Sequence, residues 1–392
     1  MRKLWVICLA LLLLTPTCAL AEEADASLTD GVTAWLNTVD WTAFERQIAA
    51  LPPAVRALWD GVLPREKTAE NALPSAGETG FPTGEKLLSR LAALLKGEGK
   101  RLGTMLTAVL GIALTGGLST ALMEEGKKGV SDAAAFACRC MMLTTVLGIF
   151  ASGAREAVEG AETMARGMEA LTPALITLLT AMGATGSAGV FQPAMALLVD
   201  GVAAAVGKVV VPLTVMGAVL GFMDTVTDRP RLTELYRLLK DGVKWMIGGV
   251  GTLYGAVTAV RGMQAAALDS VSVRAAKYAA GSLFPAAGGL VTGSFDTMLG
   301  CAQLVKNALG GTALLLCVSM AATPLLRLGV RLGLVRLAAA VCQPVAEKRQ
   351  TEMLRLCGDQ LTVLLSAMAV LTAMFLVTVG LMTGLIGFGG AG

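Results

Sequence analysis

The sequence predicts an all-α protein: a polytopic transmembrane helical bundle of about seven to nine spans, some broken or re-entrant, behind a small exported helical segment. Two observations carry this prediction. Of the 392 residues, 55% are apolar and only 16% are charged, whereas a soluble domain carries roughly 25% charged residues. The apolar residues also gather in blocks of about 20, the length that crosses a hydrocarbon core of ~30 Å.

Residues 1–21 have the pattern of a secretory signal peptide. Arg2 and Lys3 form a basic start, an apolar run too short to span a bilayer comfortably follows, and Ala19-Leu20-Ala21 is a small-x-small cleavage site. An uncleaved signal anchor is the alternative. With either, we expect the segment that follows to be exported.

Residues 22–98 are predicted to form an exported helical segment and a tether. Two short stretches carry apolar residues at i, i+3, i+4 and i+7, which indicates helices; they are Val32, Trp35, Leu36 and Val39, and then Val55, Leu58, Trp59 and Val62. Residues 64–86 mix Pro, Gly and charge with little apolar content, which is typical of a flexible linker. Residues 99–392 are then the multi-pass membrane domain.

The membrane domain divides into apolar blocks that predict spans. They are 102–122, 133–153, 171–190, 194–222, 243–260, 279–305, 308–326 and 361–388. Three amphipathic stretches lie between them, at 154–170, 227–244 and 327–341. Each is either a helix in the membrane interface or an ordinary connector.

The distribution of Lys and Arg fits this topology except in one loop. With an exported N-terminus, the basic residues of 227–244 fall on the outer side, against the positive-inside rule. The long block 194–222, interrupted by Pro212, is therefore predicted to be broken or re-entrant.

Small residues recur at a spacing that allows helices to approach closely. Four G-x-x-x-G pairs are present, at Gly217/Gly221, Gly251/Gly255, Gly289/Gly293 and Gly380/Gly384. They favour a compact bundle, or one that assembles with copies of itself or with partners.

The candidates for charged residues within the membrane are Asp200, Lys208, Asp296 and Lys306. Asp200 and Lys208, and likewise Asp296 and Lys306, are spaced so that they cannot meet on one straight helix. We expect pairing between helices instead, for instance of Asp296 with Lys208. A structural ion pair, an aqueous cavity and an ion-coupled transport site all remain open.

Prolines within the apolar blocks predict helix breaks. The residues concerned are Gln192, Pro193, Pro212, Phe284, Pro285, Gln343 and Pro344. A proline removes a backbone donor, and in lipid the freed carbonyl must find a partner or line a cavity. Hinges, conduit linings and simple packing kinks are all consistent with this pattern.

Several kinds of chemistry are excluded. The chain has no histidine, so imidazole catalysis and His-ligated zinc cannot be built from it. No G-x-x-x-x-G-K-[ST] phosphate loop is present. The cysteines form no C-x-x-C pair. We predict no catalytic residue, no metal ligand and no cofactor.

The string SVRAAKYAAGSLFPAAGGLVTGSFDTMLGCAQLVKNALG, residues 272–310, resembles the signature region of the stage III sporulation protein AE family. LLTAMGATGSAGVFQPAMALLV (178–199) and RLAAAVCQPV (336–345) are similar to the same family in order and spacing. The positions that carry the resemblance are Arg274, Lys277, Phe284, Pro285, Asp296, Lys306, Asn307, Gln192, Pro193, Gln343 and Pro344.

The resemblance implies a non-enzymatic, multi-pass component of a secretion-like sporulation channel. It implies a place in the mother-cell membrane around the forespore, with other membrane proteins of the same operon and a forespore membrane protein as partners. Nucleic acid is not among the expected partners, and a homo-oligomer is possible. From the residues themselves, a stand-alone secondary transporter is the main alternative, since broken helices and midplane charges are typical of that class. A membrane enzyme is a more distant one.

Overall fold

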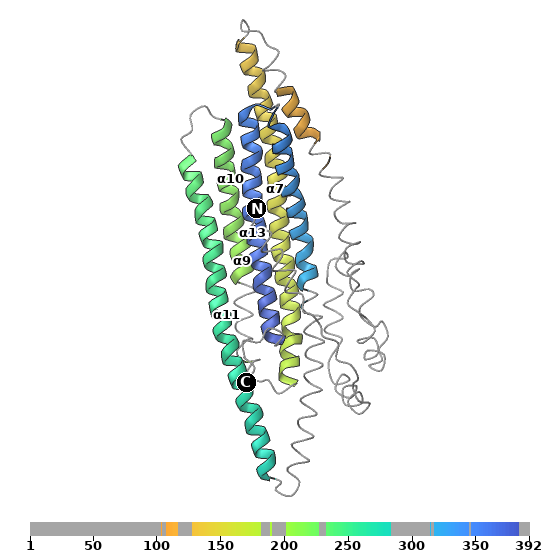
Figure 1. Cartoon of the computed structure of the whole chain (residues 1–392), viewed down its shortest axis with the longest axis vertical. Helices are drawn as coiled ribbons and strands as arrows, with labels where there is room; N and C mark the ends of the chain where they lie inside the picture. The colour runs from red at the N-terminus through yellow and green to blue at the C-terminus, as the bar shows by residue number, and fades with distance from the viewer. Residues whose placement is uncertain are drawn as a thin grey trace, which may run out of the picture.

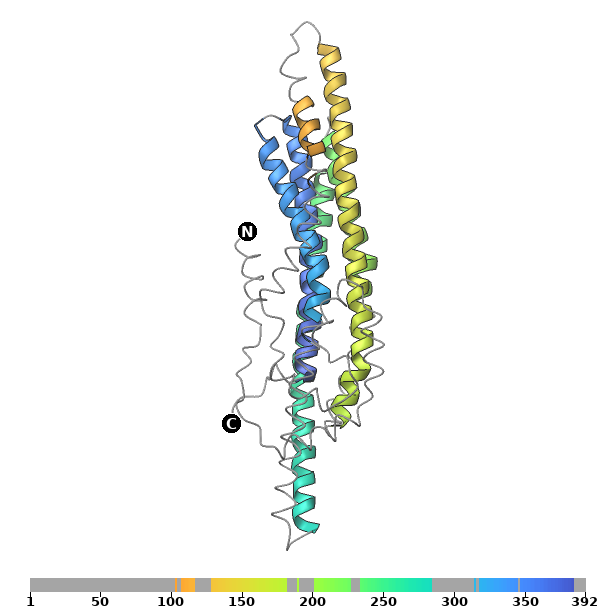
Figure 2. The same cartoon turned by 90° about the vertical axis from the view of Figure 1, so that its right-hand side faces the viewer.

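A computed structural model of the chain describes residues 107–116, 128–181, 201–226, 233–283, 317–344 and 346–383, together with Gly103, Gly189 and Leu314. This part of the chain is helical apart from residues 343, 344, 346 and 347, in agreement with the predicted all-α class. The long helices lie side by side in one elongated bundle (Figures 1 and 2).

The helices are of very unequal length. Their bounds are α7, Lys128–Ala181; α9, Ala203–Ala205; the π-helix η4, Val206–Val210; α10, Val211–Val226; α11, Thr233–Leu283; and α13, Lys348–Thr383. A short helix, Thr107–Gly116, and the helix of residues 317–342 complete the set. In Figure 1, α7, α11 and α13 run in one direction, and α10 and the helix of residues 317–342 run in the other.

α7 differs from the sequence prediction, which divided this region into spans at 133–153 and 171–190 with an amphipathic stretch between them. The structure has one continuous helix of 54 residues. The stretch 154–170 is rich in Ala, Glu, Met and Arg, which are strong helix formers. All of its charges except that of Glu156 lie on the exposed face, so the helix continues through it.

The other amphipathic stretches also continue their neighbours. α11 carries residues 233–244 and the apolar residues 245–260 in one helix of 51 residues. The stretch 327–341 belongs to the helix of residues 317–342. At 1.5 Å per residue, α7 and α11 are each roughly 75–80 Å long. Both are longer than the ~30 Å hydrocarbon core of a bilayer.

Three helices among the described residues are long and apolar enough to cross a membrane. They are Ala133–Pro173, Ala203–Val226 and Lys348–Met382. The span predicted at 279–305 lies largely outside the described residues and that at 102–122 lies partly outside them, so the number of about seven to nine stays a prediction.

α13 is the central helix of the bundle. Its residues Met353, Leu361, Met368 and Phe375 are buried almost completely and recur at a helical spacing on one face. Around them gathers one large apolar core, to which α7, α10 and the helix of residues 317–342 contribute. The rings of Phe150 and Phe222 meet edge to face, with centroids 6.3 Å apart, and so join α7 to α10.

Three glycines of α7, at a spacing of seven residues, let its backbone approach its neighbours. A Cβ at Gly153 would lie 2.7 Å from Leu361 Cδ2, and one at Gly160 would lie 2.7 Å from Pro324 Cβ. A Cβ at Gly167 would collide with Met320. A seven-residue repeat keeps one face of a helix on its partner, as in left-handed coiled coils. We call Gly153, Gly160 and Gly167 the glycine seam.

The predicted G-x-x-x-G pairs have mixed outcomes. A Cβ at Gly221 would lie 3.1 Å from the Tyr236 ring, so this glycine packs α10 against α11. Gly251 packs α11 against Val370 of α13, at 3.2 Å by the same measure, whereas Gly255 faces open space. Gly289, Gly293 and Gly384 lie outside the described residues.

Replacement of Gly160 by Ala tests the glycine seam. Because Pro324 is rigid, we expect overpacking to destabilise the protein by about 1–3 kcal/mol, less the ~0.5–1 kcal/mol that Ala gains over Gly in a helix. Gly148→Ala on the same helix is the control, since nothing lies within 4 Å of a Cβ there. Thermal unfolding of the detergent-purified protein measures both. Equal effects of the two substitutions would refute the seam.

Candidate functional site

The structure places part of the predicted site, beginning with Lys208 and Pro212. Lys208 is exposed on η4. Pro212 is exposed in the first turn of α10. The chain is not interrupted there: Ala203–Val226 is continuous, and the N–H of Val211 donates to the carbonyl of Val206, five residues back. The proline is therefore accommodated by a widened helical turn rather than by a break.

Gln343 and Pro344 lie in the turn between the helix of residues 317–342 and α13. Both side chains are exposed. The N–H of Ala346 donates to the carbonyl of Cys342 at 2.7 Å, which closes the turn. The chain reverses direction at this point (Figure 1).

The remaining predicted residues are not brought together by the described structure. Arg274 and Lys277 lie on α11, but their side chains are outside the described part. Those wholly outside it are Asp200, Asp296, Lys306, Asn307, Gln192, Pro193, Phe284 and Pro285. The pairing of Lys208 with Asp296 therefore stays a prediction.

A buried ion pair that the sequence did not predict joins α7 to the helix of residues 317–342. Nη2 of Arg331 donates to Oε1 of Glu156 at 2.7 Å, and the two side chains are only 5% and 16% exposed. Gly153 makes room for the guanidinium, since a Cβ there would lie 3.3 Å from Arg331 Nη1. Removing one partner of such a pair leaves a buried charge, so the pair fixes the two helices relative to each other.

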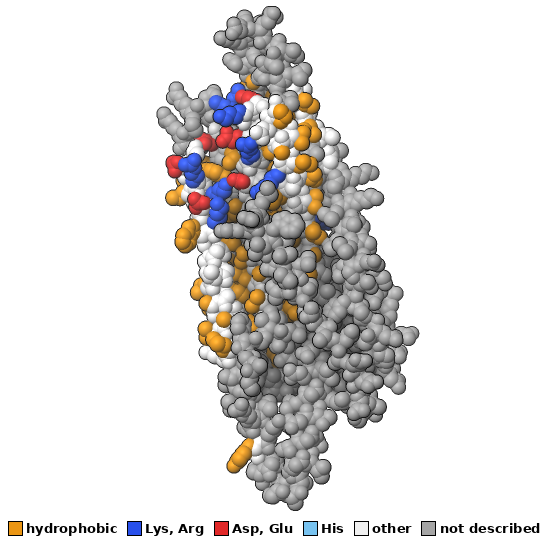
Figure 3. All heavy atoms as spheres, in the orientation of Figure 1, with side chains coloured by type: hydrophobic (Ala, Val, Ile, Leu, Met, Phe, Trp, Pro, Cys, Tyr) orange, Lys and Arg blue, Asp and Glu red, His pale blue; other side chains and the backbone are white. Residues whose placement is uncertain are grey.

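Further ion pairs join helices toward the end of the bundle at which α13 begins. Arg139 of α7 pairs with Glu347 at 3.3 Å, just before α13 begins. Lys240 of α11 pairs with Asp359 of α13 at 2.6 Å. Figure 3 shows charged side chains gathered toward the upper end of the molecule, while the exposed part of α11 below is apolar or uncharged.

The Lys240 ammonium is held in its charged form. Burial acts to lower its pKa, but the hydrogen bond to Asp359 and the electrostatic interactions with Tyr236 and Asp359 outweigh burial and raise the pKa above 10.5. A raised folded-state pKa means that the pair stabilises the protein below about pH 10.5, and that this contribution is lost as pH rises further. The ammonium also lies 5.6 Å from the centroid of the Tyr236 ring.

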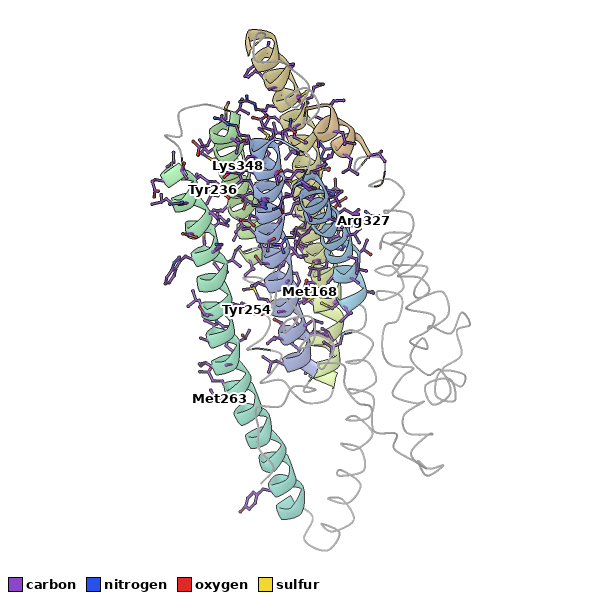
Figure 4. All side chains as sticks on the ribbon, turned by 45° about the horizontal axis from the view of Figure 1, so that its top comes forward. Met168, Tyr236, Tyr254, Met263, Arg327 and Lys348 are labelled. Carbon is purple, nitrogen blue, oxygen red and sulfur yellow. The ribbon has the colours of Figure 1, made fainter. Side chains whose placement is uncertain are left out.

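Polar side chains also lie inside the bundle along α13. Gln350 and Gln360 are almost fully buried, and Gln350 lies against Gly116 of the short helix. Lower down, Tyr254 of α11 and Thr378 of α13 share a hydrogen bond. Figure 4 shows Tyr254 and Tyr236 along α11, and Met168 within the bundle.

The described geometry holds contacts between helices rather than a reaction centre. Across the described ranges, no group of three or more His, Cys, Asp or Glu side chains is arranged to hold a metal ion. The cysteines described there are Cys138, Cys140, Cys317, Cys342 and Cys357, and all are free thiols.

Sequence reasoning missed the residues of the cross-helix pairs. Arg331 stood out only as part of a basic amphipathic stretch, and Glu156 only as part of a charged one. The two are 175 positions apart, so no local spacing joins them. The glycine seam had a visible signal in the sequence, the seven-residue period of Gly153, Gly160 and Gly167, of which the last two lie in the stretch 154–170 that separated the predicted spans.

The fold and these contacts define a class: a membrane-crossing helical bundle whose buried charges join helices. Comparison with known proteins then gives the family. The profile of the family described as stage III sporulation protein AE matches residues 76–385, and the chain belongs to that family. This confirms the resemblance seen at residues 272–310.

The chain is also similar to stage III sporulation protein AE of Bacillus subtilis strain 168. The two are 26% identical over 388 residues, and the match covers 95% of each chain. No solved structure matches the chain.

Removal of the Arg331 charge tests the buried pair. We expect Arg331→Met to destabilise the protein by about 3–5 kcal/mol, because Glu156 is left buried without its cation. The double variant Glu156→Gln/Arg331→Met should recover most of this loss. Arg237→Met, at the exposed pair with Glu234, is the control and should change stability by less than about 1 kcal/mol. Thermal unfolding in detergent measures all three; an Arg331→Met variant as stable as the control would contradict the assignment.

Proposed function

We propose that the chain is a non-enzymatic, multi-pass membrane component of a secretion-like channel complex that links the mother cell and the forespore and is needed for late forespore development. The observation that carries this proposal is membership of the stage III sporulation protein AE family over residues 76–385. The curated relative, which carries the same name, is matched over 95% of its length, so the proposal concerns the whole protein.

The long helices support a structural role in an assembly. α7 has 54 residues and α11 has 51, so both project beyond a ~30 Å hydrocarbon core. The projecting parts carry charges that pair between helices, as Arg139 does with Glu347 and Lys240 with Asp359. Rigid helical extensions of this kind offer surface to other subunits outside the membrane.

The location and partners belong to the same proposal. The protein would lie in the mother-cell membrane around the forespore, with its N-terminal segment exported behind the predicted signal at residues 1–21. Other membrane proteins of the sporulation channel operon, a forespore membrane protein and further copies of this chain would be its partners. The family resemblance and the signal pattern support this arrangement.

A stand-alone secondary transporter is the second candidate. It is favoured by one local feature: Lys208 is exposed on a π-helical turn directly before Pro212, within an apolar helix. Irregular helices with a charge near the midplane are typical of transporter sites.

Deletion of the gene in the native host separates the two candidates. The proposal predicts that heat-resistant spore counts fall by orders of magnitude while vegetative growth and solute uptake stay unchanged, and that the wild-type gene restores spores. Normal spore counts in the deletion strain would contradict the proposal. A vegetative uptake defect without a sporulation defect would favour the transporter.

Asp296 gives a residue-level test, because it is an ionisable residue in the family-pattern region. We expect Asp296→Asn to insert into the membrane at the wild-type level but to lower assembly and spore counts, since an intramembrane carboxylate is retained only with a partner or water. Asp241→Asn, an exposed residue of α11, is the control. Wild-type spore counts and assembly in an Asp296→Ala strain would remove the role assigned to Asp296.

A further inference from the structure

The outward face of α7 changes character along its length. Toward its start this face is apolar, with Phe136 53% and Met141 50% exposed. Further along, five exposed residues are all charged: Arg155, Glu159, Glu162, Arg166 and Glu169. Their spacing of four, three, four and three keeps them on one face of the helix, away from the buried glycine seam. We call these five residues the charged stripe; Figure 2 shows α7 along one edge of the bundle.

Contacts with α13 fix the depth of the charged stripe. A Cβ at Gly153 would lie 2.7 Å from Leu361, and one at Gly160 would lie 2.9 Å from Met368 Cε. Thr372 Oγ1 lies 3.9 Å from the Met164 sulfur. The stripe is therefore level with the apolar part of α13 that begins at Leu361.

α11 is also apolar at this level. A Cβ at Gly251 would lie 3.2 Å from Val370 of α13, which places the next turns of α11 beside the same part of α13. There α11 turns Leu253 and Val260 outward, 69% and 50% exposed. Exposed apolar side chains of this kind suit contact with lipid.

The charges of α11 and α13 indicate where the bilayer lies. Two levels of the bundle are possible for the hydrocarbon: an upper level, at Phe136 and Met141 of α7, and a lower level, at the charged stripe. If the hydrocarbon surrounded the upper level, it would enclose ten charged residues of α11 and α13. They are Glu234, Arg237, Lys240, Asp241, Lys244, Lys348, Arg349, Glu352, Arg355 and Asp359. At the lower level, the exposed residues of α13 after Leu361 and of α11 from Trp245 to Val260 are uncharged and mostly apolar, and one half-buried charge, Arg261, follows on α11. The hydrocarbon therefore surrounds the lower level, and the charged stripe lies at hydrocarbon depth.

Lipid cannot be what covers the charged stripe. A charge at the centre of a span costs about 2.5–3.5 kcal/mol, and such residues normally face water or a partner. Within the stripe, Arg166 and Glu162 are 3.6 Å apart and both are more than half exposed. A weak surface pair of this type needs water around it, because neither charge is shielded by protein.

We propose that the charged stripe lines a water-filled passage through the membrane, closed on its other sides by neighbouring subunits. This inference rests on the proposed function and names the helix of this chain that faces the passage. The stripe holds two Arg and three Glu, and rings of a single sign are what select ions by charge. A lining of mixed sign therefore suits small polar solutes of either charge.

Cysteine accessibility tests the proposal. In a variant without the native cysteines, single cysteines replace Glu159, Glu162 or Arg166 on the stripe, and Leu253 on α11 as the depth-matched control. Membranes of sporulating cells, which contain the native assembly, are opened and treated with a membrane-impermeant cationic thiol reagent from both sides. Glu352→Cys, exposed on α13 above the hydrocarbon, is the positive control, and reaction after solubilisation in SDS gives the total thiol.

The proposal predicts that the stripe cysteines react roughly tenfold or more faster than Leu253→Cys, because thiolates form and meet a charged reagent only in water. Three stripe positions are used, so that misfolding of one variant does not remove the test. Stripe cysteines as slow as Leu253→Cys would overturn the proposal, whether lipid or a dry protein interface covers them. Spore counts of the same strains are scored separately, so failure here is distinct from failure of the proposed function.

Discussion

The close approach of α7 to α13 and to the helix of residues 317–342 is the constraint on which the rest of the structure depends. Three glycines at a seven-residue spacing let the α7 backbone lie against Leu361, Pro324 and Met320. This approach brings Glu156 to Arg331. It also fixes the depth of every other feature of α7, including the face that points away from the bundle.

The energetics of such a bundle differ from those of a soluble core. Lipid tails are as apolar as Leu, so packing and polar contacts, rather than burial from water, hold helices together within the hydrocarbon. Small residues on α7 and methionines such as Met164, Met168 and Met368 give that packing. The Glu156–Arg331 pair adds specificity of register, because a slip of one turn would leave two buried charges without partners.

Composition and hydropathy were enough to predict the all-α class and the apolar helices that the structure has at 203–226 and 348–382. Residue patterns at 272–310 were enough to predict the family. Hydropathy failed at α7, because it averages over all faces of a helix. It divided one helix at residues 154–170, where the charges lie on the outward face except for Glu156, which pairs with Arg331 inside the bundle. The sequence also predicted a break at Pro212. The helix there is continuous, because one π-helical turn accommodates the proline.

The residues of the cross-helix pairs could not be predicted from the sequence, for a different reason. Glu156 and Arg331, or Lys240 and Asp359, meet only once the order and direction of the helices are known. Local spacing holds no information on contacts of that range.

The most direct test of the account is the length of α7 in a lipid environment. Spin labels at Phe136→Cys and Glu169→Cys, both on the exposed face of α7, are 33 residues apart along one helix. Pulsed electron paramagnetic resonance in lipid nanodiscs should give a single narrow distance near 50 Å, at about 1.5 Å per residue. A distance below about 30 Å, as expected if 154–170 joins two antiparallel spans of ~20 residues, would contradict the continuous helix and everything that depends on its register.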